Sequence, residues 1–227
     1  MNRRCRLLAV LGTGLGLVFA GALAQAHPHA WIDLEITLER DHQGRITHML
    51  HRWRFDPTYG QYLYADAQEH QEGTTSQARL QGLADEILDN LEEYDWYSHP
   101  VAGDREIGVR AAGLPAMHMA EDILFFRFRL ALEEAVDASA EPLQYKVYDP
   151  TYFIEVLHEQ PVGTRIVEPD GRAARHCRAE LERPRPDPSL VARAMVLDYG
   201  TNVDYDLGRY FAEIVTVVCE PEASGPR

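Results

Sequence analysis

Residues 30–55, AWIDLEITLERDHQGRITHMLHRWRF, alternate apolar and polar side chains on both sides of a short polar break. An alternation with a period of two is typical of a strand that buries one face. The break at residues 41–44 contains Gly44, which can adopt the positive φ that tight turns need. This stretch therefore predicts an antiparallel hairpin and indicates a fold built mainly from strands.

The apolar faces of the two strands fix how they should be aligned. If residues 41–44 form the loop, opposed residue numbers sum to 85. A slip of one residue would set an apolar face against a polar one, which disfavours it. The predicted pairs are Ala30–Phe55, Ile32–Trp53 and Ile36–Met49 on the apolar face, and His29–Asp56, Trp31–Arg54 and Asp33–Arg52 on the polar face.

Beyond the hairpin, the sequence first follows a helical pattern of apolar residues and then returns to strand patterns. Residues 76–97 carry apolar side chains at spacings of three and four, which predicts an amphipathic helix, and YGQYLYADA (59–67) before it resembles a short helix. After Pro100 come several short alternating segments, then the rigid RPRPDP connector (183–188), a short helix at 189–197 and a last strand. This order predicts a mainly β (α+β) fold, an antiparallel β-sandwich-like domain with an inserted amphipathic helix and a short C-terminal helix.

The first 26 residues have the features of a cleaved secretory signal. Three arginines precede an apolar run at residues 7–23, and Ala24-Gln25-Ala26 fits a cleavage site before His27. An uncleaved N-terminal anchor is the alternative, although the run is short for one. We therefore expect a signal peptide at 1–26 and a single periplasmic domain at 27–227, with a helical insertion at about 57–98 and no membrane anchor after cleavage.

The net charge of the processed chain limits the classes of molecule that it is expected to bind. Removing three arginines from 22 basic residues leaves 19 against 36 acidic residues, a formal net charge of −17. Such a balance argues against nucleic acid and against anionic lipid headgroups, and it is compatible with attracting cations. Two cysteines remain, Cys177 and Cys219, each in a strand-like segment. In an oxidising compartment such a pair predicts a disulfide between neighbouring strands.

The same four-residue sequence follows two of the predicted strands. Asp56 begins the DPTY of FDPTY (55–59), and Asp149 begins the same four residues in YDPTY (148–152). Asp-Pro after a strand reverses the chain well, because the carboxylate caps following amides and proline fixes φ. The two segments are either simply two similar turns, or they place Asp56 and Asp149 at the same end of a sandwich.

Cleavage would give His27 a free α-amine beside its imidazole, and these two nitrogens can chelate one metal ion. His29 supplies a third nitrogen donor, and imidazole-rich sites suit zinc, nickel, cobalt or copper. Pro28 has no amide proton to lose, so a square-planar site through backbone amides is blocked. A carboxylate from Asp56 or Asp149 would complete the shell. The alternative is an ordinary exposed strand histidine next to a frayed terminus.

The other histidines lack metal-ligand spacing. His51 lies on the apolar side of its strand and is expected to be a buried core histidine with satisfied hydrogen bonds. The chain has no HExxH, CxxC, nucleophile-elbow or phosphate-loop motif, so we do not expect an enzyme.

Four segments together resemble a known family: HPHAWID after the apolar run, WRFDPTY, KVYDPTYFIE and the final FAEIVTVVC. They resemble the domain of unknown function 1007 family, which is described as a periplasmic component of an uncharacterised ABC-type transport system. The resemblance spans the processed chain and implies a context of nickel/cobalt-type permeases, without naming catalytic residues. Some relatives carry a calcium-loop-like stretch, but DAQEHQEGTTSQ (66–77) lacks that spacing. The matching positions are His27, His29, Asp33, Trp53, Phe55, Asp56, Tyr148, Asp149, Pro150, Tyr152 and Cys219.

These observations lead to three expected functions. The first is a periplasmic protein that binds a divalent transition metal (Zn, Ni, Co or Cu) and captures or delivers it for a membrane permease or ABC-type transporter. The second is a non-metal accessory subunit that contacts a permease through its acidic face. The third is an oxidoreductase in which copper is held by the N-terminal histidine and another imidazole. Metal content of the processed protein would discriminate among them best.

Overall fold

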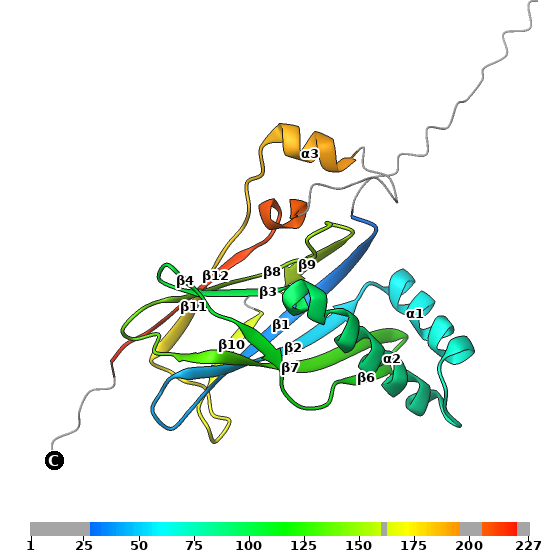
Figure 1. The fold of residues 1–227 in the computed structure, drawn as a ribbon, viewed down its shortest axis with the longest axis horizontal. Helices are drawn as coiled ribbons and strands as arrows, with labels where there is room; N and C mark the ends of the chain where they lie inside the picture. The colour runs from blue at the N-terminus through cyan, green and yellow to red at the C-terminus, as the bar shows by residue number, and fades with distance from the viewer. Residues whose placement is uncertain (1–27, 160–162, 196–205, 222–227) are drawn as a thin grey trace, which may run out of the picture.

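The computed structural model describes residues 28–159, 163–195 and 206–221, which fold into two sheets and a helical layer (Figure 1). The seven-stranded sheet, sheet A, has the order β10-β1-β2-β7-β5, with β9 also paired to β1 and β6 to β7. Sheet B has the order β11-β12-β8-β3-β4. The expected mainly β sandwich with inserted and C-terminal helices is confirmed.

Each sheet draws its strands from several parts of the chain. Sheet A contains β1 (Ala30–Arg40), β2 (Ile46–Phe55), β5 (Val109–Ala111), β6 (Ala116–Ala120), β7 (Ile123–Val136), β9 (Ile154–His158) and β10 (Thr164–Val167). Sheet B contains β3 (Ser98–Ala102), β4 (Arg105–Glu106), β8 (Leu143–Val147), β11 (Cys177–Glu182) and β12 (Ile214–Cys219). The helices are α1 (Pro57–His70), α2 (Ser76–Asn90) and α3 (Pro188–Met195), with 3₁₀ turns η1 (Glu92–Tyr97) and η2 (Leu207–Tyr210).

The β1–β2 hairpin forms with the predicted faces but in a different register. Opposed numbers sum to 87 rather than 85 over most of its length, so Ile32 faces Phe55. The turn is one residue tighter than expected, since the backbone N–H of Asp41 donates to the carbonyl of Arg45, and a bulge then adds one residue on β2. A shift of two keeps both faces intact, which is why the alternating pattern alone could not detect it.

The shift changes the cross-strand pairs. The predicted pairs on both faces, including Asp33–Arg52 and His29–Asp56, are wrong. On the polar face Asp33 instead lies opposite Arg54, with its carboxylate 2.5 Å from the guanidinium. Arg52 contacts Glu35, also at 2.5 Å.

The other edge of β1 carries two parallel partners. Ala30 pairs with Ile154 of β9, and further along Ile36 pairs with Thr164 of β10. Parallel pairing requires a long connection between the two strands. The alternation of side chains within either strand therefore does not predict which strand it pairs with. As a result β1 lies inside sheet A, between β2 on one side and β9 and β10 on the other.

The helical insertion packs against sheet A. Helix α1 contacts β7 and α2 contacts β6, and the buried side of α2 joins the main core through Leu80, Leu83, Ala84 and Leu88. The expected helix at 76–97 ends at Asn90 and continues as the 3₁₀ turn η1, in which the backbone becomes left-handed from Asp95 to Tyr97. The Trp96 indole N–H donates to the carbonyl of Leu88, which holds this turn against the end of α2.

The core lies between the two sheets. Trp53, Phe126 and Phe128 from sheet A and Tyr145 from sheet B are at most 2% exposed. The Trp53 ring meets both phenylalanines edge-on at centroid distances of 5.8 and 5.1 Å, an arrangement that aromatic quadrupoles favour. No helix among the described residues is long and apolar enough to cross a bilayer.

A disulfide joins two neighbouring strands at one end of sheet B. Cys177 of β11 lies directly opposite Cys219 of β12, and the two sulfurs are 1.98 Å apart. The predicted disulfide between neighbouring strands is confirmed. It is consistent with an oxidising, extracytoplasmic compartment.

Candidate functional site at the N-terminal end of β1

His29 lies immediately before β1 and its side chain is exposed. Its backbone N–H donates to the carbonyl of Phe153 at 2.8 Å, and the two rings lie 4.8 Å apart. The sheet therefore fixes the backbone at this histidine. His27, the residue that would carry the chelating amine, lies outside the described residues.

Asp56 follows β2 and caps α1. Its Oδ1 accepts the backbone N–H groups of Thr58 and Tyr59, each at 3.0 Å. Its Oδ2 accepts the N–H of Trp31 at 3.2 Å, and its own N–H donates to the Trp31 carbonyl. Asp56 is thus opposite Trp31, two residues along the strand from His29. Its Oδ2, with one accepted hydrogen bond, keeps a lone pair for a further partner.

Asp149 is used differently. It is 3% exposed, and its carboxylate accepts hydrogen bonds from three donors: the N–H of Thr151, the N–H of Ile154, and the single hydroxyl of Thr151, which lies 2.8 and 2.9 Å from the two oxygens. Asp56 also has three donors, so burial rather than hydrogen bonding distinguishes the two carboxylates. The hydrogen bonds of Asp149 stabilise the turn that leads into β9 beside β1. Asp149 therefore lies in the segment next to the start of β1, with its carboxylate committed to that turn.

A third carboxylate at this end was not predicted. Glu155 of β9 accepts the Trp31 indole N–H at 3.0 Å and the Tyr152 hydroxyl at 3.2 Å. Trp31, 46% exposed, is therefore flanked by Asp56 on one side and Glu155 on the other. Only the parallel pairing of β9 with β1 brings Glu155 to this end of the sheet.

The donors that the structure describes do not form a metal site by themselves. Among residues 28–159, 163–195 and 206–221, no group of three histidine, cysteine or acidic side chains is close enough to hold an ion. The donor set predicted from the sequence takes two of its nitrogens from His27, so its described part consists of His29 and one carboxylate. Because Asp56 is half-buried whereas Asp149 is 3% exposed, Asp56 is better suited to that role.

A buried polar network lies under a cleft of about 490 Å³, whose lining includes Glu159, Arg183 and Glu213. The Glu213 side chain, 4% exposed, accepts the backbone N–H of His158 at 2.7 Å and faces its Nδ1 at 3.0 Å. Burial alone would raise the pKa of Glu213, but the hydrogen bonds and charge from His158 outweigh burial and lower it. This carboxylate joins the end of β9 to the start of β12.

The network continues into the sandwich. The Tyr145 hydroxyl lies 3.3 Å from His158 Nε2 and 2.6 Å from the Thr164 hydroxyl. On β2, His51 is fully buried as predicted, stacks on Phe128 at 4.4 Å, and is 3.2 Å from the hydroxyl of Ser98. Within the part of the chain that the structure describes, its Nδ1 has no hydrogen-bond partner, so the expectation of full satisfaction is wrong for that atom. Burial lowers the pKa of His51 to about 3 and keeps it neutral.

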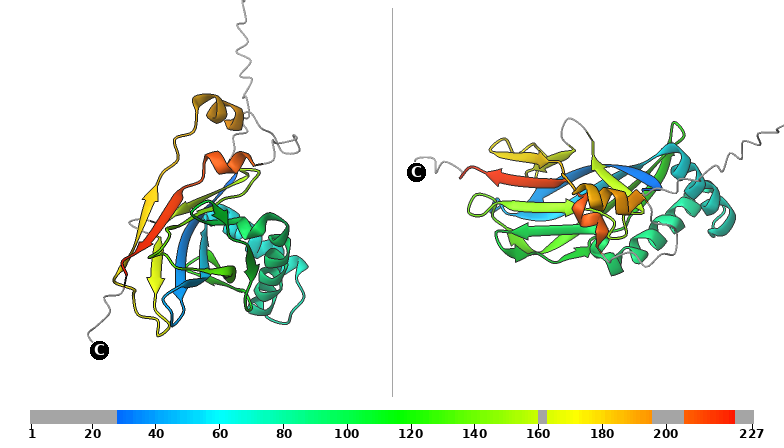
Figure 2. Two further views of the ribbon diagram at one scale, coloured as in Figure 1. Left: turned by 60° about the vertical axis from the view of Figure 1, so that its left-hand side comes forward. Right: turned by 90° about the horizontal axis from the view of Figure 1, so that it is seen from above.

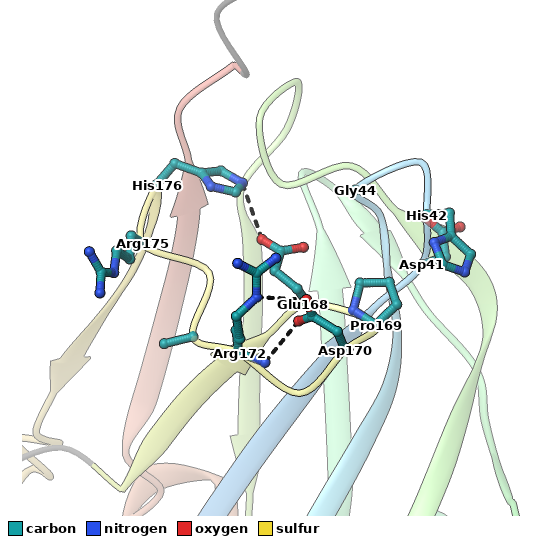
Figure 3. Close-up of a pocket in the computed structure, with 10 residues that line it drawn as sticks. Asp41, His42, Gly44, Glu168, Pro169, Asp170, Arg172, Arg175 and His176 are labelled. Atoms are coloured by element: carbon teal, nitrogen blue, oxygen red, sulfur yellow. Dashed lines mark hydrogen bonds and ion pairs between the residues drawn. The ribbon is translucent and has the colours of Figure 1, made fainter.

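A larger cleft, of about 870 Å³, opens at the opposite end of β1 between the 41–44 loop and residues 168–176 (Figure 3). The almost buried Arg40 guanidinium beneath it contacts Glu168 at 2.6 Å and His176 Nε2 at 2.5 Å. Since arginine only donates, this histidine nitrogen accepts. Asp170 on the cleft wall pairs with Arg172. The Arg40 contacts join the end of β1 to the 168–176 segment, whereas the Asp170–Arg172 pair lies within that segment.

The fold and this site define a disulfide-bonded β-sandwich protein with a helical insertion and histidine, tryptophan and carboxylate side chains at the N-terminal end of its first strand. A family model described as "Protein of unknown function (DUF1007)" matches residues 13–219, and the chain belongs to that family. It is 24% identical over 206 residues to an uncharacterized protein of Haemophilus influenzae, an alignment that covers 86% of this chain and 92% of the relative.

Proposed function

We propose that this is a periplasmic accessory protein that binds a divalent transition metal (Zn, Ni, Co or Cu) and captures it for, or delivers it to, a membrane permease or ABC-type transporter. In this proposal it acts as a binding protein and not as an enzyme. The α-amine and imidazole of His27, the imidazole of His29 and the carboxylate of Asp56 hold the ion. Imidazole and amine nitrogens with one carboxylate suit these ions.

The observation that carries the proposal is the placement of His29 and Asp56. His29 is exposed on backbone that the sheet holds in place, and Oδ2 of Asp56 contacts the backbone of Trp31, two residues further along. A flexible terminus would have to lose conformational freedom to bind a metal, whereas this strand has already lost it on folding. Only His27, one residue before Pro28, remains to be brought to the ion.

Calorimetry with zinc, nickel and copper(II) tests the proposal on protein that begins at His27. One additional alanine before His27 removes the amine–imidazole chelate, and we expect affinity to fall at least about tenfold. His29→Ala should weaken binding as well. Asp56→Asn keeps one oxygen as a helix cap and removes both the charge and the acceptor of the Trp31 N–H, so a loss of affinity beyond its small loss of stability would assign the carboxylate. Unchanged affinity for all three metals in the extended protein would refute the chelate.

Trp31 provides a second readout at the same place. It is 46% exposed and lies two residues from His29, whereas Trp53 and Trp96 are at most 6% exposed. Copper(II) or nickel bound at the proposed site should quench the Trp31 emission, and Trp31→Phe should remove most of the quenching. If metal-free protein prepared with EDTA binds a permease as tightly as loaded protein does, the non-metal accessory function replaces this one.

A further inference from the structure

Strand β11 is an edge strand of sheet B, and no strand pairs with its outer side among the residues that the structure describes. It pairs with β12 over all six of its residues without a bulge. In Figure 2 (left) it lies at the outside of the molecule, beside the red strand β12. A regular edge of this kind is a template for pairing with one more strand.

The other edges of the two sheets are short or covered. Strands β4 and β5 have two and three residues. Ala173 and Ala174 turn back along β10 and bond to its backbone. The carboxylates of Asp149 and Glu213 accept N–H groups at the two ends of β9, and Gln77 of α2 donates to a carbonyl of β6. Within the described part of the chain, β11 is therefore the long, regular edge that stays open.

The hydrogen bonds of β12 show which residues of β11 point outward. Cys219 donates its N–H to the carbonyl of Ala138, away from β11, and Cys177 lies directly opposite Cys219. Because alternate residues of an antiparallel pair bond to each other, Cys177, Ala179 and Leu181 point their backbone groups outward. The N–H groups of Ala179 and Leu181 have no acceptor in the described chain.

The side chains of β11 carry a charge pattern that is complementary to itself. Arg178 and Glu180 are exposed, whereas Ala179 and Leu181 pack against the core from the other face. If two copies of β11 pair antiparallel about Ala179, each Arg178 lies opposite Glu180 of the second copy. Facing residues at these positions do not bond through their backbones, so their side chains approach closely. The pairing therefore forms two attractive contacts.

Other registers are less favourable. Pairing about Arg178 or about Glu180 sets that residue opposite its own copy, so two like charges meet. Pairing about Leu181 sets Glu180 opposite Glu182, and pairing about Cys177 overlaps the two strands at that residue alone. The register about Ala179 is thus the one in which all charged pairs within the strands attract.

We propose that β11 is the interface of a two-fold symmetric dimer, in which two copies of this chain pair their β11 strands antiparallel about Ala179. The outward backbone groups of Ala179 and Leu181 supply the hydrogen bonds, and Arg178 with Glu180 selects the register. Sheet B then continues from one molecule into the other, through the same surface on each. The Cys177–Cys219 disulfide fixes β11 on β12 beforehand, which reduces the entropy lost on association.

The size of the interface and the charge of the chain set the strength of the dimer. Six residues of edge strand form a small interface, and the net negative charge of each copy opposes association. We therefore expect a weak, reversible dimer. A strand of another protein could bond to the same backbone groups, but the charges of β11 are met by β11 itself. The inference does not depend on metal binding, since metal-free protein tests it.

Sedimentation velocity of the protein that begins at His27, with EDTA and over a range of concentrations, tests the proposal. The unaltered protein should show a monomer–dimer equilibrium. Arg178→Glu sets two carboxylates opposite each other, and Glu180→Arg sets two arginines together, so each should weaken the dimer at least about tenfold. An equimolar mixture of these two variants should regain it, because every facing pair is again of opposite charge. The double variant should regain it as well.

Matched controls change the net charge equally at exposed positions away from β11, namely Arg110→Glu and Glu72→Arg. Both should dimerise like the unaltered protein, and circular dichroism should show that all variants are folded. A monomer at every concentration, or undiminished association of both single variants, would overturn the proposal. Loss of the dimer in the single variants without recovery in their mixture would overturn the self-pairing of β11.

Discussion

At the scale of single residues, the sandwich encloses two titratable side chains with opposite requirements. Glu213 is buried in its charged form and is held by His158, whereas His51 is buried neutral beside Phe128. A fall in pH destabilises the protein through each side chain by a different route. Acid neutralises the carboxylate that joins β9 to the start of β12, and it favours unfolded chains in which His51 can be charged. Both effects reduce stability as the pH falls, but over different ranges.

Replacing His51 by leucine should flatten the stability profile between neutral pH and pH 5. The pKa of His51 is about 3 in the folded protein against 6.5 in the unfolded chain, so the unfolded state binds the extra proton between these values. The loss of stability between pH 7 and pH 5 should be about 2 kcal/mol smaller in His51→Leu than in the unaltered protein. Urea denaturation at both pH values measures it. His42→Gln, at an exposed loop histidine, should leave the profile unchanged; an unchanged profile in His51→Leu would contradict the prediction.

Glu213→Gln should act at lower pH. Because the folded pKa lies below the usual value of 4.5, the charged carboxylate contributes its full stability above about pH 4.5 and loses it as the pH falls through the folded pKa. The variant should lose about 1–3 kcal/mol at pH 7 and show a shallower decline below pH 4.5. Glu180→Gln, on the exposed face of β11, is the matched control. Parallel declines for both variants would argue against the Glu213–His158 contact.

At the scale of elements, the same four residues begin two different structures. After Asp56, DPTY forms the first turn of α1, and the carboxylate caps the second and third residues after it. After Asp149, DPTY forms a tight turn in which Tyr152 has a φ of 59° and the carboxylate reaches Ile154. The residues after each DPTY decide its structure, since they carry a helical pattern in one case and form the strand β9 in the other.

Asp56→Ala should destabilise the protein by about 0.5–2 kcal/mol, because two N–H groups of α1 and the N–H of Trp31 lose their acceptor. Asp56→Asn should lose less, since the asparagine oxygen keeps the helix cap and only the Trp31 N–H loses its acceptor. Thermal or urea unfolding of the two variants side by side measures the difference. Equal losses would mean that the charge and the Trp31 contact, rather than the cap, matter for folding.

At the scale of the whole molecule, the disulfide joins the last described strand to an edge strand. The cysteines are 42 residues apart, and closing a loop of that length stabilises a protein by about 4 kcal/mol in the chain-entropy treatment. Cys177→Ser with Cys219→Ser should lower the free energy of unfolding by about 3–4 kcal/mol. Dithiothreitol should destabilise the unaltered protein similarly and leave the double variant unaffected. Retained stability in the reduced protein would show that pairing of β11 with β12 suffices.

The sequence predicted the features that depend on local periodicity and on pairs of similar residues. The faces of β1 and β2, the helical insertion, the short helix at α3, the disulfide and the burial of His51 are all indicated by alternation, helical spacing or cysteine count. The exact register was not. A turn one residue tighter than expected and a one-residue bulge together shift it by two residues without disturbing either face, and this places Asp56 opposite Trp31 rather than His29.

The features that depend on distant strands could not be predicted. Glu155 reaches Trp31 only because β9 pairs in parallel with β1, and Glu213 reaches His158 only because β12 starts beside the end of β9. Neither strand carries a local signal of its partner. Metal binding by His27, His29 and a carboxylate stays a prediction for calorimetry.

The position of β1 inside its sheet bears on how an exported chain would fold. Trp31 contacts Glu155 across 124 residues, and Ile36 pairs with Thr164. A chain that emerged from a translocation channel N-terminus first would present β1 and β2 long before β9 and β10 appeared. Contacts between such distant segments form slowly, so one edge of β1 would remain unpaired during this time. We therefore expect a translocating chain to remain a substrate for chaperones until residue 167 has emerged, with the N-terminal end of β1 among the last regions to become ordered.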